Sequence, residues 1–208
     1  MNEKILLMGC KGCGSAIAES FLTLGKIPYL RKEVDYSKDS PDRQELMKYN
    51  PLGQVPTLIL PNQVVLTETL AIANYVQTRA PMAGLIPHDF DQLTLYWRWS
   101  TFLVSTIYPT FTYGDDPGKW VETSEDSSEL RKSTDEHRKN MWLVIEKECS
   151  GLPWFLQKFS AIDIYIAVML QWRPGSKWFD EHCPKLVSIS KQVAQKPELK
   201  GVWNLNFA

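Results

Sequence analysis

The sequence predicts a mixed α/β domain followed by an all-α helical domain, and three observations support this fold class. Strand and helix patterns alternate through residues 1–80, which is typical of a sheet covered by helices. Residues 81–88 contain two prolines and a glycine, as linkers often do. From residue 89 onward the strand signals fade and long helical stretches take over. We therefore expect two domains, at residues 1–80 and 89–208, joined by a linker at 81–88.

The first domain should contain its elements in the order β-α-β-α-β-β-α. Apolar runs predict the strands, helical spacing of apolar residues predicts the helices, and Ser15 is a candidate N-cap. The predicted strands and helices are, in order, residues 4–8, 15–25, 28–34, 42–49, 57–60, 64–66 and 67–79. We expect the first β-α-β unit to be parallel and right-handed, and the closing hairpin to be antiparallel.

The second domain should be built from helices alone. Their predicted ranges are residues 89–106, 127–149, 161–172 and 184–195. A long segment from Pro109 to Asp126, rich in aromatic and acidic residues, separates the first two helices, and we expect a loop there. Ser160-Ala161-Ile162-Asp163 has the spacing of a capping box at the start of the third helix.

The composition argues against several classes of partner. A formal net charge of −1 gives no reason to expect nucleic acid or an anionic membrane surface. No apolar run approaches the roughly 20 residues that span a bilayer, and the N-terminal apolar run is too short for a signal peptide. We therefore expect a cytoplasmic protein. Cys149, Cys183 and the three histidines lack paired spacing, so no metal site is expected.

The turn at residues 10–15, Cys-Lys-Gly-Cys-Gly-Ser, is the first candidate site. It lies between a predicted strand and a predicted helix, where backbone N–H groups and the helix dipole favour a thiolate. Cys-x-x-Cys in this setting is a redox signature. The alternative is that Cys10 and Cys13 are simply small residues filling a tight turn.

Two further segments could hold a ligand. Val55 precedes Pro56 at a strand entry, where a cis peptide could leave the Val55 backbone facing an extended ligand. Glu68 and Thr69 stand where a helix begins, so that their N–H groups could hold a carboxylate and Glu68 could hold an ammonium group. Each segment also has a purely structural interpretation, as a strand-entry proline and as ordinary helix capping.

Taken together and in this order, these segments resemble the cytosolic glutathione S-transferases, which combine a thioredoxin-like domain with a helical one. The stretch Gly53-Gln54-Val55-Pro56-Thr57-Leu58 is similar to that family's cis-proline loop, and Thr67-Glu68-Thr69 to its acidic-hydroxyl pair. The capping box at Ser160 to Asp163 is also similar to the signature box in the family's sixth helix. The resemblance covers nearly the whole chain.

The resemblance implies a glutathione site and its residues. Val55 would pair with the cysteinyl part of glutathione, with Pro56 in the cis form. Gln54 would lie beside the tripeptide backbone, and Glu68 and Thr69 would hold the γ-glutamyl end. The electrophile pocket would come from the helical domain, with Tyr108, Phe111 and Tyr113 as its candidate lining. The family is usually dimeric, so a homodimer is expected by analogy.

The residue facing the glutathione sulfur is where the sequence departs from the family. The usual tyrosine position falls near Met8, and the serine or cysteine position falls on Gly12 or Gly14. Cys13 and Ser15 are therefore the catalytic candidates, with Cys10 behind them. A hydroxyl donor would support detoxifying conjugation of glutathione to small hydrophobic electrophiles. A reactive Cys13 would support glutathione-dependent disulfide reduction or deglutathionylation. A third hypothesis is a non-catalytic glutathione-binding regulator.

Overall fold

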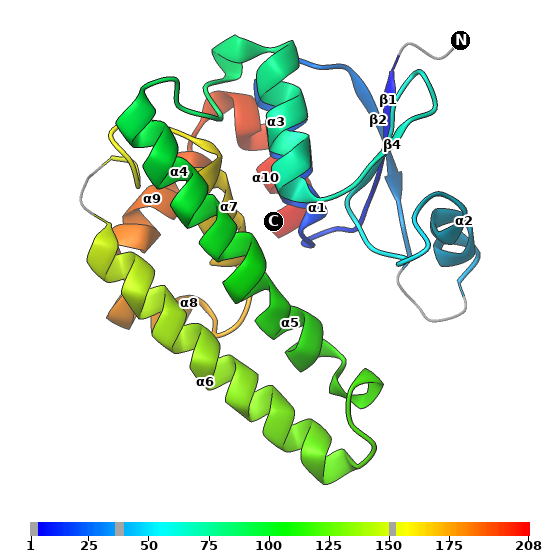
Figure 1. Cartoon of the computed structure of the whole chain (residues 1–208), viewed down its shortest axis with the longest axis vertical. Coiled ribbons are helices and arrows are strands. Elements are labelled where there is room, and N and C mark those ends of the chain that lie inside the picture. The colour runs from blue at the N-terminus through cyan, green and yellow to red at the C-terminus, as the bar shows by residue number, and fades with distance from the viewer. Residues whose placement is uncertain (1–3, 36–39, 150–152) are drawn as a thin grey trace. The chain divides into compact units, whose positions relative to one another are not determined.

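The computed structural model describes residues 4–35, 40–149 and 153–208 (Figure 1). The chain forms two compact units, one of Met1–Ile86 with Gln192–Ala208 and one of Pro87–Lys191. The N-terminal part of the first unit ends at Ile86, within the segment 81–88 that was expected as a linker. The unit also includes the C-terminal segment of the chain, which the sequence analysis assigned to the helical domain 89–208.

The first unit has the predicted order β-α-β-α-β-β-α. Its elements are β1 (Ile5–Gly9), α1 (Ser15–Leu24), β2 (Tyr29–Glu33), α2 (Pro41–Tyr49), β3 (Thr57–Ile59), β4 (Val65–Leu66) and α3 (Thr69–Arg79). The strand order in the sheet is β2-β1-β3-β4. β1 and β2 are parallel, whereas β1–β3 and β3–β4 are antiparallel. The fold class and the strand directions predicted from the sequence are thus confirmed.

Helices cover both faces of this sheet. Successive strand residues point to opposite faces, so each face presents side chains for a helix to pack against. On one face, Met8 packs with Ile59 and with Leu46 of α2 in a buried apolar cluster. α1 and α3, which contact each other, lie on the side of the sheet opposite to α2 (Figure 1). α1 is almost entirely buried, and Ile17 and Phe21 are fully shielded from solvent. The sheet therefore holds the ends of its strands, and the loops that follow them, in fixed positions.

The C-terminal segment completes this unit. A 3₁₀ turn at Pro197–Leu199 and helix α10 (Lys200–Phe207) both contact α1. Leu199 and Val202 are buried there. The sequence predicted neither element, and the apolar pattern of so short a segment cannot say which of two units will bury it.

The second unit is helical, as predicted. Its helices are α4 (Phe90–Phe102), a π-helical turn at Leu103–Ile107, α5 (Tyr108–Asp115), α6 (Ser124–Glu148), α7 (Ala161–Met169), α8 (Ser176–His182) and most of α9 (Pro184–Ala194). The segment from Pro109 to Asp126, expected as a loop, instead begins within helix α5, and it also contains a 3₁₀ turn at Pro117–Lys119 and the start of α6. Pro109 stands in the first turn of α5, directly after the π-helical turn, where the backbone hydrogen-bond pattern of the helix changes.

Buried polar groups tie this unit together. The Arg138 side chain on α6 is fully buried and donates from Nε to Thr110 Oγ1 at 2.8 Å and from Nη2 to the Thr110 carbonyl oxygen at 3.0 Å. Its guanidinium also lies 3.7 Å from the centre of the Phe111 ring. Because a buried cation is tolerated only when it is paired, these contacts and the ion pair with Asp135 hold α5 against α6.

The predicted capping box at the start of α7 is present. The buried Asp163 carboxylate accepts the Ser160 N–H at 2.8 Å and also the Phe155 N–H at 2.8 Å. Burial raises the pKa of the Asp163 carboxyl to about 7, against the opposing effect of these hydrogen bonds. The carboxyl therefore holds both a helix start and the loop before it.

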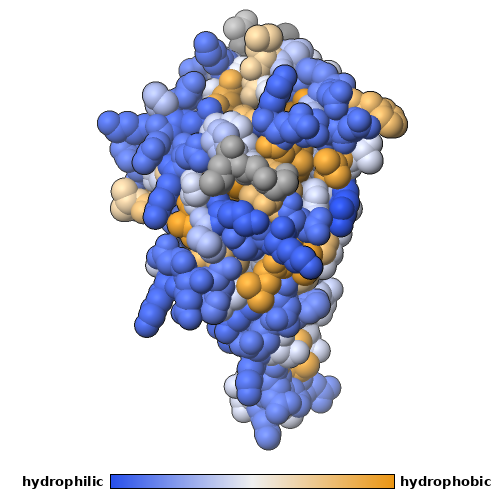
Figure 2. All heavy atoms as spheres, turned by 90° about the vertical axis from the view of Figure 1, so that its left-hand side faces the viewer, coloured by the Kyte–Doolittle hydropathy of each residue, from blue (hydrophilic) through white to orange (hydrophobic). Residues whose placement is uncertain are grey.

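The surface carries scattered apolar side chains among mainly hydrophilic ones, as the face drawn in Figure 2 illustrates. The most exposed large apolar residues are Met82, Phe90 and Leu52. Single exposed apolar residues are normal on folded proteins. Of the helices in the described part of the chain, none has the length and apolar character needed to span a membrane.

Candidate functional site

Sheet register brings the three candidate segments to one end of the sheet. Met8, near the end of β1, pairs with Thr57, the first residue of β3. The turn at 10–15 and the loop ending at Pro56 therefore leave the sheet side by side. Leu66, the last residue of β4, pairs with Leu58, so the segment 67–69 emerges at the same end. Residues far apart in the sequence are thus gathered into one candidate site in the first unit.

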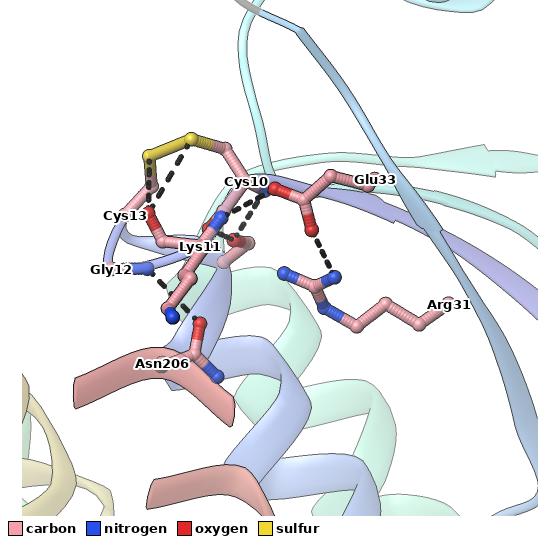
Figure 3. Close-up of a disulfide and its surroundings, with 8 residues drawn as sticks. Cys10, Lys11, Gly12, Cys13, Arg31, Glu33 and Asn206 are labelled. Atoms are coloured by element: carbon pink, nitrogen blue, oxygen red, sulfur yellow. Dashed lines mark hydrogen bonds and ion pairs between the residues drawn. A yellow bond between two sulfur atoms is a disulfide. The ribbon is translucent and has the colours of Figure 1, made fainter. Parts of the chain in front are cut away.

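The Cys10 and Cys13 sulfur atoms are joined as a disulfide in this structure (Figure 3). The four residues form a turn in which the Cys13 N–H donates to the Cys10 carbonyl oxygen at 3.2 Å. Gly12, the third residue, has φ of +73°, which a type II turn requires and which favours glycine. Both cysteines are half-buried, so small thiols can reach them. The pair therefore has the position and access of a redox site.

Ser15 lies directly behind this turn and is buried. Its hydroxyl accepts the Cys10 N–H at 3.0 Å and donates to the Cys10 carbonyl oxygen at 2.9 Å. It does not cap α1, whose N-cap is Gly14. A Cβ on Gly9 would approach Ser15 Cβ to 2.9 Å, so this close packing also requires glycine at position 9. Because its single proton is already used, Ser15 supports the turn rather than offering a donor to a ligand's thiol.

Two side chains that the sequence analysis missed hold the middle of the turn (Figure 3). Glu33, at the end of β2, accepts the Lys11 N–H at 2.7 Å. Asn206, on α10, accepts the Gly12 N–H at 3.2 Å through Oδ1. The sequence contains a weak indication that Glu33 lies near the turn, because Glu33 lies near the end of a predicted strand parallel to the strand that leads to Cys10. Asn206 gave none, because nothing local marks a contact across so much of the chain.

The loop at 50–57 is built around the side chain of Asn50. Its Nδ2 donates to the Gln54 carbonyl oxygen at 3.0 Å and to Thr57 Oγ1 at 3.2 Å, and its Oδ1 accepts the Leu52 N–H at 3.2 Å. The Val55–Pro56 peptide is cis, as the family resemblance implied. The Gln54 side chain is exposed. Asn50 thus fixes the shape of the loop, a role that the sequence analysis did not assign to it.

Glu68 stands at the N-cap of α3 with φ of +61°, a value that is uncommon outside glycine. Residues held in such a conformation concentrate at ligand sites, where the rest of the structure offsets the strain. The Glu68 carboxylate is exposed, and Thr69 begins the helix. The positive end of the α3 dipole and an anionic side chain are therefore adjacent, which suits a ligand carrying both a carboxylate and an ammonium group.

The three aromatic residues predicted to line an electrophile pocket are in the second unit and differ in exposure. Tyr108 and Phe111 both pack edge-on against Trp172, with ring centroids 5.8 and 5.2 Å apart. Phe111 is buried and the Tyr108 hydroxyl is shielded from solvent. Tyr113 is 41% exposed and contacts the Trp120 ring. Only Tyr113 of the three offers a ligand substantial surface.

The other cysteines have no such position. Cys149 and Cys183 are both buried, and neither forms a disulfide. Burial raises the pKa of the Cys183 thiol to about 12, with a smaller effect from the Glu146 carboxylate. A thiol held neutral in this way is a poor nucleophile.

Within residues 4–35, 40–149 and 153–208, no cluster of three or more metal-ligating side chains is found.

Comparison with known proteins agrees with this geometry. The model of the glutathione S-transferase N-terminal domain matches residues 16–79. The uncharacterised GST-like protein YncG of Escherichia coli K12 is 35% identical over 208 residues, which cover 97% of this chain and 98% of YncG.

Solved structures are similar along almost the whole chain. A glutathione transferase homologue from Sulfitobacter with bound glutathione has a TM-score of 0.86 at 22% identity, covering 97% of this chain and 98% of its own. A sphingomonad glutathione S-transferase complexed with glutathione has a TM-score of 0.78 at 25% identity, covering 98% and 100%. The chain belongs to the glutathione S-transferase family.

Proposed function

We propose that this protein is a glutathione-dependent disulfide reductase in which Cys13 and Cys10 are the reacting groups. The observation that carries the proposal is the Cys10–Cys13 pair, half-buried at the end of the sheet where the cis-proline loop and Glu68 also emerge. Conjugation, the first hypothesis from the sequence, needs a donor to the glutathione sulfur. Ser15, the candidate donor, gives its proton to the Cys10 carbonyl oxygen instead.

In the proposed complex, glutathione contacts the residues that the family resemblance implies. Its cysteinyl backbone pairs with Val55, its γ-glutamyl end lies at Glu68 and Thr69, and Gln54 flanks the peptide. The positive end of α3 stabilises the γ-glutamyl carboxylate, and the Glu68 carboxylate pairs with the ammonium group. The sphingomonad relative complexed with glutathione supports this choice of ligand.

The proposed reaction is two rounds of thiol–disulfide exchange. A glutathione thiolate attacks Cys13 Sγ, and Cys10 leaves as a thiolate that takes up a proton. A second glutathione thiolate attacks the sulfur of the bound glutathione, which releases oxidised glutathione and the Cys13 thiolate. Cys13 then attacks a substrate disulfide and expels one thiol, and Cys10 attacks Cys13 to expel the other. Two glutathione molecules thus supply both electrons and both protons that the substrate gains.

The proposal includes a cytoplasmic location and a homodimer, by analogy with the family. A reducing cytoplasm suits the cycle, because abundant glutathione would return the disulfide to the dithiol form. Small mixed disulfides of glutathione are the substrates expected first, since one half of such a molecule already matches the proposed glutathione site.

A comparison of two substrates tests the proposed function. With reduced glutathione present, the purified protein should reduce a mixed disulfide between glutathione and a small thiol, measured by coupled oxidation of NADPH through glutathione reductase. Turnover of a chloro-nitroaromatic should stay near the uncatalysed rate. Turnover of the aromatic alone would establish conjugation instead. Glutathione binding without turnover of either substrate would establish a binding regulator.

A Glu68→Gln variant is expected to bind glutathione roughly tenfold more weakly, a loss of about 1.4 kcal/mol. The amide keeps the size of the carboxylate but loses the charge that attracts the ammonium group. Isothermal titration calorimetry with reduced glutathione measures the change. Glu122→Gln, at another exposed glutamate, is the matched control and should bind as wild type does. Equal affinities in wild type and Glu68→Gln would move the γ-glutamyl end away from α3.

A further inference from the structure

The central peptide of the Cys10–Cys13 turn has a fixed orientation. The peptide group that joins Lys11 to Gly12 carries the Lys11 carbonyl on one side and the Gly12 N–H on the other, since the bond is trans. The Gly12 N–H points to Asn206 Oδ1, 3.2 Å away. The carbonyl oxygen consequently faces the cysteines, 3.6 Å from Cys10 Sγ and 3.7 Å from Cys13 Sγ.

Both polar atoms of the Asn206 side chain are hydrogen-bonded. The side chain is buried, and its Nδ2 donates to Glu19 Oε2 at 3.0 Å and to the Val202 carbonyl oxygen at 2.9 Å. Because Nδ2 faces a carboxylate and a carbonyl, Oδ1 must be the atom that faces the Gly12 N–H. Glu19 is buried in α1 and is fixed in turn by Arg31, whose Nε lies 3.3 Å from Glu19 Oε2.

These contacts close a ring that returns to the turn. Arg31 also pairs with Glu33, and Glu33 accepts the Lys11 N–H at 2.7 Å. Lys11 and Gly12, the two residues between the cysteines, are therefore each held by a side-chain acceptor (Figure 3). These two acceptors, Glu33 and Asn206, are linked through Arg31 and Glu19. Such closed polar networks hold one geometry more firmly than their separate bonds would.

The chemical consequence concerns the reduced state. A thiolate is stabilised by N–H donors and destabilised by a nearby carbonyl oxygen. The ring directs both central N–H groups of the turn to side chains, and it presents a carbonyl oxygen to the sulfur atoms. Since a disulfide carries no charge, this arrangement disfavours the thiolate form relative to the disulfide. A pair held in this way should be more reducing than one whose sulfur atoms face N–H groups.

We infer that Asn206 is a positioning residue for the cysteine pair, which holds the Lys11–Gly12 peptide with its carbonyl toward the sulfur atoms and so keeps the pair reducing. Loss of the Asn206 amide would let this peptide rotate from the type II toward the type I turn, which Gly12 permits. The Gly12 N–H would then face the sulfur atoms and stabilise a thiolate. The inference rests on the proposed function, because it assigns the pair a redox role.

The test is the equilibrium between the protein disulfide and glutathione. Protein is equilibrated in buffers of varied reduced-to-oxidised glutathione ratio, thiols are alkylated, and the Cys10–Cys13 peptide is quantified by mass spectrometry. Asn206→Ala should shift the equilibrium roughly tenfold toward the dithiol, which is about 30 mV for this two-electron couple. The pH profile of alkylation should move to lower pH in the same variant.

Two matched variants separate this effect from simple damage to α10. Asn206→Gln keeps an amide that can accept the Gly12 N–H and donate to Glu19, and it should stay near the wild-type equilibrium. Asn204→Ala removes an exposed amide from the same helix and should change nothing. An unchanged equilibrium in Asn206→Ala, or an equal shift in Asn206→Gln, would overturn the inference.

A measurement on the wild type covers the case in which Asn206→Ala does not fold. The Gly12 amide should exchange slowly with deuterium in both the oxidised and the reduced protein, and rapid exchange in either state would contradict the inference. These measurements need no turnover. A protein that shows the Asn206 effect but reduces no substrate therefore contradicts only the proposed function, and active enzyme without the effect contradicts only the inference.

Discussion

Cys13→Ser is expected to abolish reduction of glutathione mixed disulfides, with a loss on the order of 1000-fold in kcat/KM. The hydroxyl cannot form the mixed disulfide through which both electrons pass. Glutathione binding should remain, because the proposed contacts to the peptide come from Val55, Glu68 and Thr69. The coupled NADPH assay and calorimetry on the same preparation measure the two properties separately.

Cys10→Ser is the informative partner variant. Without the second thiol, Cys13 should remain joined to one glutathione after exposure to oxidised glutathione, which intact-mass analysis detects. Glutathione trapped on Cys10 in the Cys13→Ser variant, with none trapped on Cys13 in the Cys10→Ser variant, would mean that glutathione attacks Cys10 and that Cys13 is the leaving thiol. Full activity in Cys13→Ser would end the cysteine mechanism altogether.

Asp163→Ala should have the largest effect on stability, with a loss of about 3–5 kcal/mol in the free energy of unfolding. The substitution leaves the Phe155 and Ser160 N–H groups buried without their acceptor and removes the capping box of α7. Urea unfolding followed by circular dichroism measures the change. Asp180→Ala, at an exposed aspartate in α8, is the control and should unfold as wild type does.

The difference in the free energy of unfolding between wild type and Asp163→Ala should also depend on pH. The pKa of the Asp163 carboxyl is raised in the folded state from its ordinary value of 3.8 to about 7. The folded protein therefore binds this proton more tightly than the unfolded chain, so its stabilising contribution is complete below pH 3.8 and declines as the pH rises to about 7. The stability difference between wild type and Asp163→Ala should narrow from pH 5 to pH 8. A difference that widens with pH would mean that the carboxylate is held ionised.

The parts of the fold that were predicted correctly depend on local patterns. Apolar alternation and helical spacing gave the order of the first seven elements, and the Ser160–Asp163 spacing gave the start of α7. The error between Pro109 and Asp126 has a local cause as well. Proline and glycine suggested a loop, but Pro109 falls in the first turn of α5, directly after the π-helical turn, where the backbone hydrogen-bond pattern of the helix changes.

The site shows where local reasoning stops. The cis Val55–Pro56 peptide and the helix start after Glu68 follow from short motifs, and the structure has both. The role of Ser15 depends on its distance from the Cys10 peptide, which a turn one residue longer or shorter would change. Asn206 acts from a different end of the chain, and only tertiary packing of α10 on α1 brings it to Gly12.

The grouping of Gln192–Ala208 with the first unit matters for anyone who would cut or tag this protein. A gene fragment that stops at Ile86 would encode the sheet and its loops but not the helix that covers part of α1. Such a fragment would expose apolar surface and leave the Gly12 N–H without its side-chain acceptor. An affinity tag is therefore better placed at the amino terminus, since α10 packs on α1 and Asn206 accepts the Gly12 N–H.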